Sequence, residues 1–285
     1  MKVLKEYLDY IEKNKKLSQN TVASYNRDLR KYMDYLNCKN INIVDVVENN
    51  ISVSSISRMI SSIKSYHDYL FFNRLTTSDP SKNIKKPKVK REEVEILTEE
   101  EVDKLLKFDD LSTPKKVRDK AIFEVLYGTG IKVSELIEMN LEDIDLDIDY
   151  IYCGSSKNQR VIPLCETTKF YLLKYINDSR DILTYPEEKA LFVNAQGQRF
   201  TRQGLWKLIK KYAKEADINK NINPTTLRHS FAIHLLNGGA NVAVVSKILG
   251  NSNLSSLQLY LKYIDKNIRK EIKEKHPREN DMNYK

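Results

Sequence analysis

The sequence predicts a mainly α-helical protein with a small β element, divided into two domains. Most segments repeat apolar residues at intervals of three and four, the spacing of one buried helix face. One stretch, 144–153, instead alternates and is rich in β-branched residues, and a turn at 154–158 separates it from 160–164. These features predict a β-hairpin or small sheet. Segment 79–94 has many lysines and little apolar content, which predicts an extended linker between the domains.

Length and composition suit a globular protein with a real core. The chain has 285 residues, room for two ordinary domains, with 31% charged and 41% hydrophobic residues. No apolar run is long enough for a membrane span, and the N-terminus, MKVLKEYLDYIEKNKK, lacks a secretory apolar region. We therefore expect a cytoplasmic protein without a membrane anchor.

Charge favours a polyanionic partner but does not decide the matter. The net charge is +9, which favours nucleic acid. A lysine-rich composition without any such partner explains the same charge, because 39 acidic residues are also present. The three cysteines lack CxxC spacing and the four histidines do not cluster, so neither a disulfide framework nor a metal site is expected.

The first predicted domain, residues 1–85, is helical. Its helix-period segments lie at about 3–11, 18–36, 43–47 and 55–72. Arg58 and Lys64 fall on the polar side of the last of these helices. Such a pair is typical of a solvated face, and the alternative is contact with a phosphate backbone.

The second predicted domain covers 96–285 and follows a basic linker at 86–95. It begins with Thr98-Glu-Glu-Glu101, which has the S/T-x-x-E pattern of a capping box. A short helix with one apolar face is also expected at 264–275. The other helices are predicted at 118–127, 133–139, 167–175, 201–216, 227–236, 242–249 and 255–260.

The most informative segment is TTLRHSFAIHLLNGGANVAVVSKILGNSNLSSLQLYLKY, residues 225–263. Arg228 lies early in it, Tyr260 lies near its end, and the pattern between them is helical and apolar. An arginine and a tyrosine on adjacent packed helices can bind and attack one phosphodiester, because the cation stabilises the phosphate charge while the hydroxyl supplies the nucleophile.

This segment resembles the C-terminal signature of the tyrosine recombinases, most closely the Xer type. The resemblance extends to RDKAIFEVLYGTGIKVSELIEMNLEDIDL at 118–146, to 191–218, to KEKHPREN at 273–280 and to the LSxNTxxSYxxDLxxYxxYL pattern near the N-terminus. It implies a C-shaped clamp on duplex DNA, made of a helical SAM-like core-binding domain and a catalytic domain. It also implies DNA strand exchange through a 3′-phosphotyrosine, without metal or cofactor, by a homo- or hetero-oligomer assembled on DNA through the C-terminal tail.

Only some of the family's catalytic positions hold the family's residue in this chain. Tyr260 falls on the nucleophile and Arg228 on the second arginine. The first arginine should precede VSEL, where this chain has Lys132. Lysine keeps the positive charge but lacks the planar guanidinium group, which can donate hydrogen bonds to two phosphate oxygens at once.

The remaining catalytic positions have lost their usual side chains. The hairpin lysine should follow Gly154, where Ser155 stands, although Lys157 lies in the same turn. The two histidine positions hold Thr225 and Asn251, which donate hydrogen bonds but do not titrate near neutral pH. His229 and His234 are expected to be structural.

For DNA contacts, the resemblance favours basic residues of both domains and the linker. Three hypotheses stay open: a Xer-like recombinase with weak activity, a DNA-binding protein that no longer cleaves, and a basic protein whose partner is another recombinase. The target site and the context, whether chromosome dimer resolution, a mobile element or regulation, also stay open. The expected DNA-contacting residues are Arg58, Lys64, Lys85, Lys86 and Arg202.

Overall fold

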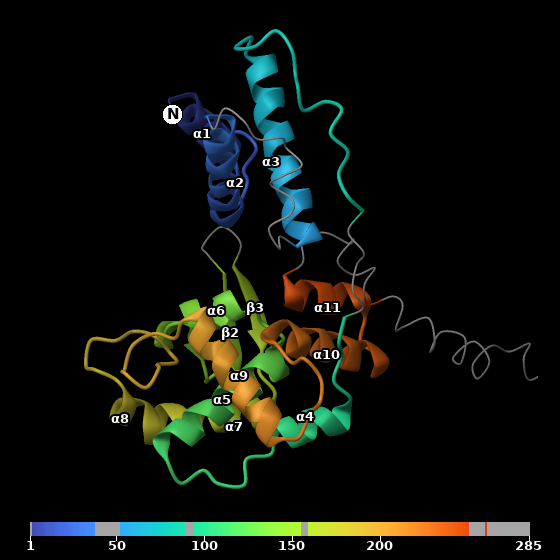
Figure 1. Cartoon of the computed structure of the whole chain (residues 1–285). Coiled ribbons are helices and arrows are strands. Elements are labelled where there is room, and N and C mark those ends of the chain that lie inside the picture. The colour runs from blue at the N-terminus through green and yellow to red at the C-terminus, as the bar shows by residue number, and fades with distance from the viewer. Residues whose placement is uncertain (1, 38–51, 89–93, 155–158, 251–259, 261–285) are drawn as a thin grey trace, which may run out of the picture. The chain divides into compact units, whose positions relative to one another are not determined.

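The computed structural model describes residues 2–37, 52–88, 94–154, 159–250 and 260, and it is mainly helical with one small sheet (Figure 1). The chain divides into two compact units, residues 1–92 and 93–285. The expected helices at 43–47, 255–260 and 264–275 fall wholly or largely outside the described residues. None of the helices in the described ranges is long and apolar enough to cross a membrane.

The first unit is a small helical bundle of α1 (Lys2–Lys13), α2 (Gln19–Asn37) and α3 (Val53–Phe72). The predicted apolar stripes form its core. Leu36, in the last turn of α2, continues the apolar pattern of that helix but is 58% exposed. The buried hydrophobic residues are Leu4, Tyr7, Ile11, Leu29, Ile63 and Tyr66.

The first helix of the second unit, α4, begins where the sequence signal predicts it. Thr98 Oγ1 accepts from the Glu101 backbone N–H, and the Glu101 carboxylate accepts from the Thr98 N–H, so the predicted capping box is confirmed. A short 3₁₀ helix at 141–143 and a π-helix at 176–180 interrupt the regular elements. The α-helices of this unit are α4 (Glu99–Leu106), α5 (Pro114–Thr129), α6 (Val133–Glu138), α7 (Glu166–Tyr175), α8 (Asp181–Leu183), α9 (Arg202–Glu215), α10 (Pro224–Asn237) and α11 (Val242–Leu249).

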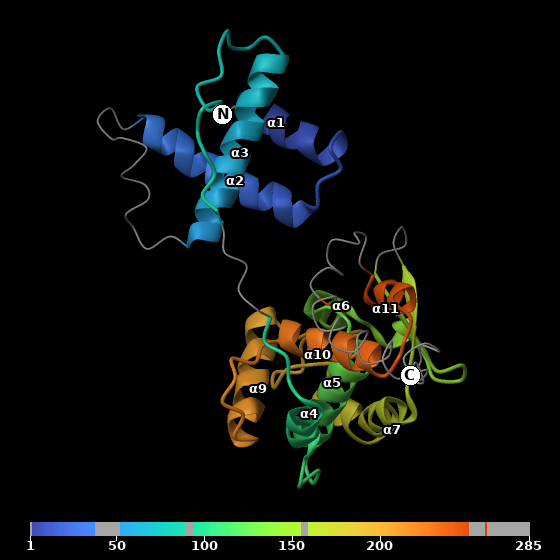
Figure 2. The same cartoon turned by 90° about the vertical axis from the view of Figure 1, so that its right-hand side faces the viewer.

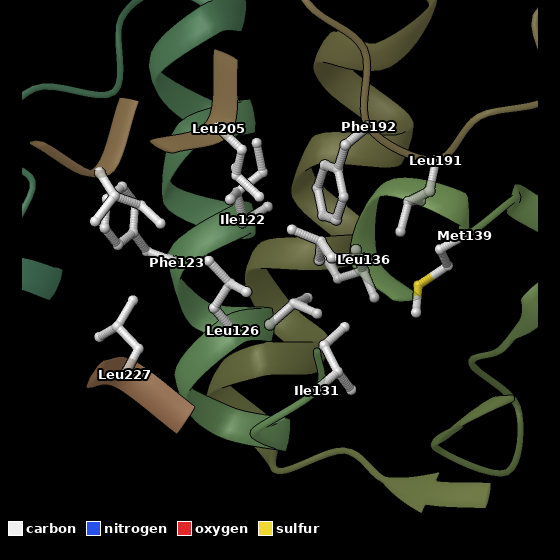
Figure 3. Close-up of a cluster of buried hydrophobic side chains, with 14 of the residues drawn as sticks. Ile122, Phe123, Leu126, Ile131, Leu136, Met139, Leu191, Phe192, Leu205 and Leu227 are labelled. Carbon is white, nitrogen blue, oxygen red and sulfur yellow. The ribbon is translucent and has the colours of Figure 1, made fainter. Parts of the chain in front are cut away.

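Helix α5 runs through the middle of this unit and is buried on almost every side. It packs against α7 and α10. Ile122, Phe123 and Leu126 project from it into a cluster with side chains of α6, α9 and α10 (Figure 3). Burying a large aliphatic side chain contributes about 1.5–3 kcal/mol, so this cluster fixes the helix ends around it. Those helix ends carry the candidate site.

The β element is a three-stranded antiparallel sheet, in the order β1 (Ile144–Asp145), β2 (Tyr150–Cys153) and β3 (Arg160–Pro163). The predicted small sheet is confirmed, and the stretch 144–153 supplies two of its strands. A turn that contains Asp149, with a backbone φ of 62°, divides the stretch into two strands.

Helix α10 starts earlier than its apolar pattern suggests. Asn223 caps it by accepting from the backbone N–H groups of Thr225 and Thr226, and Pro224 occupies the first turn, where a missing N–H costs nothing. Figure 2 shows α10 beside α11, and the two helices are in contact. Because of this extra turn, Arg228 lies one turn inside the helix and not at its start.

Side chains of α10 also hold the segment that leads into the second unit. Ser230 Oγ accepts from the Leu97 N–H at 2.9 Å, and His234 Nε2 lies 2.9 Å from the Leu97 carbonyl oxygen. The other imidazole nitrogen of His234 lies 2.8 Å from the Tyr127 hydroxyl. Because a carbonyl only accepts, Nε2 carries a proton, and His234 therefore fastens the backbone of Leu97 to α10.

Candidate active site

Arg228 is fixed at the meeting point of three helices. Its side chain donates from Nη1 to the carbonyl of Gly130 and from Nη2 to the carbonyl of Leu249, both at 2.6 Å. Gly130 ends α5 with a φ of 59°, and a Cβ there would lie 2.3 Å from the Phe231 ring. Burial lowers the pKa of Arg228 from its very high ordinary value, and the group stays a cation at neutral pH.

Tyr260 lies close to Arg228, and its hydroxyl is within hydrogen-bond distance of the His229 imidazole. Its hydroxyl is 2.8 Å from Nδ1 of His229, and the residue is only 2% exposed. Burial raises the pKa of Tyr260, with Arg228 opposing that shift. Burial, with a smaller contribution from Arg228, lowers the pKa of His229 to about 4. At neutral pH the pair is therefore a protonated phenol facing an uncharged imidazole.

A second arginine lies in the same cluster. Arg160, the first residue of β3, makes a bidentate ion pair with Glu135 of α6, with N–O distances of 2.7 and 2.8 Å. Its Nε donates to the Ile248 carbonyl at 2.6 Å. Gly250 closes over the guanidinium, because a Cβ at that residue would lie 2.9 Å from it. The sheet is thereby tied to the ends of α6 and α11.

Glu135 connects these groups to Lys132. Its carboxylate accepts from the Lys132 backbone N–H at 2.8 Å and lies 3.6 Å from the Lys132 ammonium. Burial opposes ionisation of Glu135, but the hydrogen bonds from Arg160 and from the Lys132 backbone hold the pKa of Glu135 below its usual value. Arg228 interacts electrostatically with Tyr260, Glu135 and Arg160, so these groups form one charged cluster.

The structure brings together some of the predicted site residues. Tyr260 and Arg228 share the cluster. Lys132 is at its edge, with its side chain 46% exposed. Thr225 is exposed in the first turn of α10, where its backbone N–H donates to Asn223. Ser155, Lys157 and Asn251 lie outside the described residues.

Sequence reasoning missed three members of this cluster. Glu135 had a visible signal, since it stands three residues after Lys132 in VSEL, at the position that caps a helix start. Arg160 had only its place at the start of a predicted strand. His229 was expected to be structural, and its imidazole nitrogen Nδ1 lies 2.8 Å from the Tyr260 hydroxyl.

The basic residues predicted to contact DNA have separate surroundings. Arg58 makes a bidentate ion pair with Asp28, at 2.9 and 3.0 Å. The Lys64 ammonium donates to the Lys82 carbonyl at 3.2 Å and so ties α3 to the following segment. Arg58 also borders an open groove rich in hydroxyl groups. The other lining residues of that groove are Asn20, Thr21, Ser24, Tyr25, Ser54, Ser57 and Ser61.

The remaining three basic residues are on the surface. Lys85 and Lys86 are exposed in the segment that follows α3, and Arg202 is exposed as the first residue of α9. None of the three has an ion pair among the described residues. Their positive charge is therefore available to solvent or to an anionic partner.

Two family models cover most of the chain. Residues 95–266 match the phage integrase family, and residues 4–72 match the phage integrase N-terminal SAM-like domain. The chain belongs to the phage integrase family. Its two matched regions fall in the two compact units of the structure, so the family assignment covers both.

Full-length relatives narrow the assignment within the phage integrase family. The chain is 39% identical to the tyrosine recombinase XerD of Oceanobacillus iheyensis, over 96% of this chain and 98% of that protein. It is 38% identical to the tyrosine recombinase XerD of Staphylococcus epidermidis, over 97% and 99%. The chain is thus a Xer-like tyrosine recombinase, as the resemblance implied.

Solved structures share the fold of this family member. The XerH site-specific recombinase bound to its palindromic difH substrate matches with a TM-score of 0.72 at 19% identity, over 95% of this chain and 83% of that one. The Tn1549 transposon integrase in complex with a circular intermediate DNA matches with a TM-score of 0.71 at 20% identity, over 94% and 99%. The predicted fold class is confirmed.

Proposed function

We propose that Tyr260 is the nucleophile with which this Xer-like recombinase cuts a strand of duplex DNA at a specific site. The proposal rests on the surroundings of the Tyr260 hydroxyl. The side chain is buried, its hydroxyl lies within hydrogen-bond distance of the His229 imidazole, and the buried Arg228 interacts with it electrostatically. A phenol with a raised pKa is inert alone, and a neighbouring cation and proton acceptor are what a phosphoryl-transfer site must add.

The reaction balances without a cofactor. The Tyr260 oxygen forms a bond to phosphorus, the bond from phosphorus to the 5′ oxygen breaks, and the phenolic proton leaves the tyrosine. Arg228 and Lys132 supply positive charge for the non-bridging phosphate oxygens. The energy of the broken ester is kept in the 3′-phosphotyrosine, so a 5′ hydroxyl from another strand can reverse the step and complete the exchange.

The leaving 5′ oxygen is the weak point of this chemistry. It needs a proton, and the family positions that supply one hold Ser155 and Asn251 here. Lys157, two residues after Ser155 in the sequence, is the candidate acid that the chain retains. Loss of one transition-state donor costs on the order of 10²–10³ in rate, so we expect slow cleavage of ordinary DNA by this chain alone.

We propose that the DNA itself is held by basic residues of both units. Arg58 and the hydroxyl groups around it form a surface of donors suited to phosphate oxygens. Lys85, Lys86 and Arg202 add exposed positive charge, and Lys64 lies on the same helix as Arg58. The relatives described above include recombinases whose structures contain DNA. Duplex DNA is therefore the partner that this surface fits.

We further propose that the protein acts as an oligomer on DNA. The sequence at 264–275 places isoleucines at 264, 268 and 272, the spacing of one helix face. An isolated helix gains by burying such a face against another surface. We expect that surface to belong to a neighbouring protomer when two half-sites are occupied.

One experiment tests the proposed nucleophile. Bound duplexes are selected from a randomised library, and the selected site is rebuilt with nicks placed so that the cleaved fragment diffuses away. Denaturing gels then measure the covalent protein–DNA adduct. We expect an adduct that the Tyr260→Phe variant does not form. Absence of an adduct both from this chain and from a variant with the family's residues restored would indicate a DNA-binding protein that does not cleave.

A further inference from the structure

His229 occupies a position that the usual catalytic set of this family does not account for. Its Nδ1 is 2.8 Å from the Tyr260 hydroxyl, and the rings lie 5.5 Å apart between centroids. His229 is partly buried and the tyrosine that it contacts is only 2% exposed, so the access of water to the hydroxyl is restricted. The reacting oxygen of the proposed nucleophile therefore already has a nitrogen base within hydrogen-bond distance.

We infer that His229 is a further catalytic residue, which accepts the proton of Tyr260 as the phenolic oxygen attacks phosphorus. This inference rests on the proposed role of Tyr260 as nucleophile. The step balances: the oxygen–phosphorus bond forms, the phenolic O–H bond breaks, and Nδ1 of His229 gains the proton. The proton returns to the tyrosine oxygen when a 5′ hydroxyl attacks the phosphotyrosine in the reverse direction.

The local geometry explains why His229 can act as the proton acceptor. Arg228 is pinned by two carbonyl groups at the ends of α5 and α11, and His229 follows it directly in α10. Thr225, three residues before Arg228, is exposed and carries no base. The proton acceptor missing at Thr225 is thus replaced by an imidazole four residues onward, just over one helical turn away on the same helix.

Electrostatics set the direction of the proton transfer. In the free protein Arg228 adds to the burial that keeps His229 uncharged, and an uncharged imidazole has a lone pair with which to accept. The other charged groups of the cluster are Glu135 and Arg160, which interact with Arg228, and Lys132 at its edge. A phosphodiester beside Arg228 brings one negative charge that offsets the arginine. DNA binding therefore makes the imidazole a better base at the moment when Tyr260 must lose its proton.

The test uses the selected DNA site with sulfur in place of the 5′ oxygen at the cleaved phosphate. A thiolate leaves without a proton, because thiols have a pKa of about 8.5, far below that of an alcohol. The rate of adduct formation then reports on the attacking side alone and not on the missing acid. The variants are His229→Gln and His229→Asn. The matched control is His234→Gln, a histidine of the same helix that contacts Tyr127 and the backbone of Leu97.

The expected result is a change in both rate and pH dependence. Loss of a general base typically costs 10²–10⁴, and we expect His229→Gln to lower the rate by about 10². Without a base only ionised tyrosine attacks, so the rate of His229→Gln should rise about tenfold per pH unit between about pH 7 and 9. The unmodified protein and His234→Gln should show a nearly flat profile over that range. His229→Asn keeps an acceptor oxygen near the hydroxyl but takes no proton, so it should behave like His229→Gln.

Two outcomes of the cleavage assay overturn the inference and leave the nucleophile proposal intact. Equal pH profiles for His229→Gln and the unmodified protein would show that His229 does not take the proton. If His229→Asn formed the adduct almost as fast as the unmodified protein, His229 would only hold the hydroxyl in place. Absence of any adduct from the unmodified protein on the sulfur-containing DNA would instead overturn the nucleophile proposal, and the proton-transfer step with it.

A measurement without DNA checks the contact itself. Histidine imidazole resonances can be followed by NMR as pH falls, with His229 identified from the signal missing in His229→Gln. Because the phenol donates to the uncharged imidazole, the contact lowers the pKa of His229, and Tyr260→Phe should raise it. An unchanged titration of His229 in Tyr260→Phe would show that the hydroxyl does not donate to Nδ1, which overturns the inference whatever the cleavage assay gives.

Discussion

Glu135 is expected to be the residue whose loss most disturbs the candidate site without touching the nucleophile. Its side chain and that of Arg160 are each only 12% exposed, and they form two hydrogen bonds with each other. Glu135→Ala leaves the arginine buried without its partner. Breaking a buried ion pair by removing one side typically costs 3–5 kcal/mol. The change also removes the acceptor for the Lys132 N–H at the start of α6, worth about 1 kcal/mol.

We therefore expect Glu135→Ala to lower the free energy of unfolding of the second unit by about 4 kcal/mol. Trp206 is the only tryptophan of the chain and lies in α9 of that unit, so its fluorescence follows the unfolding of that unit in urea. The matched control is Glu138→Ala, at an exposed position in the last turn of the same helix, expected to change stability by less than about 0.5 kcal/mol.

The double variant Glu135→Leu with Arg160→Met removes the ion pair without leaving a buried arginine unpaired. It therefore separates the loss of the pair from the cost of an unpaired buried charge. Replacing both members of a buried pair by apolar residues is often nearly neutral, so the double variant should be more stable than Glu135→Ala. A loss below about 1 kcal/mol in Glu135→Ala would refute the reasoning, because it would show that water or another group satisfies Arg160.

Acid should weaken this contribution. The folded-state pKa of Glu135 lies below its unfolded value, so the ion pair stabilises the protein above the unfolded pKa of about 4.3 and less as pH falls below it. The difference in stability between the unmodified protein and Glu135→Gln should therefore shrink as urea unfolding is repeated from neutral pH down through pH 4. A difference that grows on acidification would contradict the sign.

Other predictions concern DNA. Arg58→Ala with Lys64→Ala should weaken binding to the selected duplex and lower the salt slope by up to about 2, measured by fluorescence anisotropy; an unchanged slope would exclude these contacts. Deleting 264–285 should abolish cooperative occupancy of paired half-sites in gel-shift assays while sparing single-site binding. Restoring the family's residues should raise adduct formation on ordinary nicked DNA by at least about 10², whereas no gain would show that the pocket no longer accepts them. The restored variant carries Lys132→Arg, Ser155→Lys, Thr225→His and Asn251→His.

Local signals carried most of the fold prediction. The capping box at Thr98 and the apolar periodicity of α3 are written in neighbouring residues, so the sequence alone locates these helices. The sheet was harder to foresee. The break at Asp149 depends on a left-handed backbone that aspartate tolerates without demanding it, so the alternating pattern concealed a turn.

Part of the candidate site could be predicted from the sequence through the family resemblance and not through local patterns. Tyr260 and Arg228 could be found by resemblance, since each stands in a long matching segment. The helix-capping position of Glu135 could be read from its neighbours, but its ion pair with Arg160 and the contact of His229 with Tyr260 join distant elements, and no local pattern predicts them. His229 is particularly hard to foresee, because consecutive residues of a helix point about 100° apart. It meets the same cluster as Arg228 only because α10 is buried on most sides.

The most direct test of the account is to identify the amino acid that becomes joined to DNA. The covalent adduct formed on the sulfur-containing duplex is digested with protease and nuclease, and the modified peptide is sequenced by mass spectrometry. The account predicts a nucleotide on the Tyr260 oxygen, attached through a 3′ phosphate. An adduct on any other residue, or one that persists in Tyr260→Phe, would contradict it.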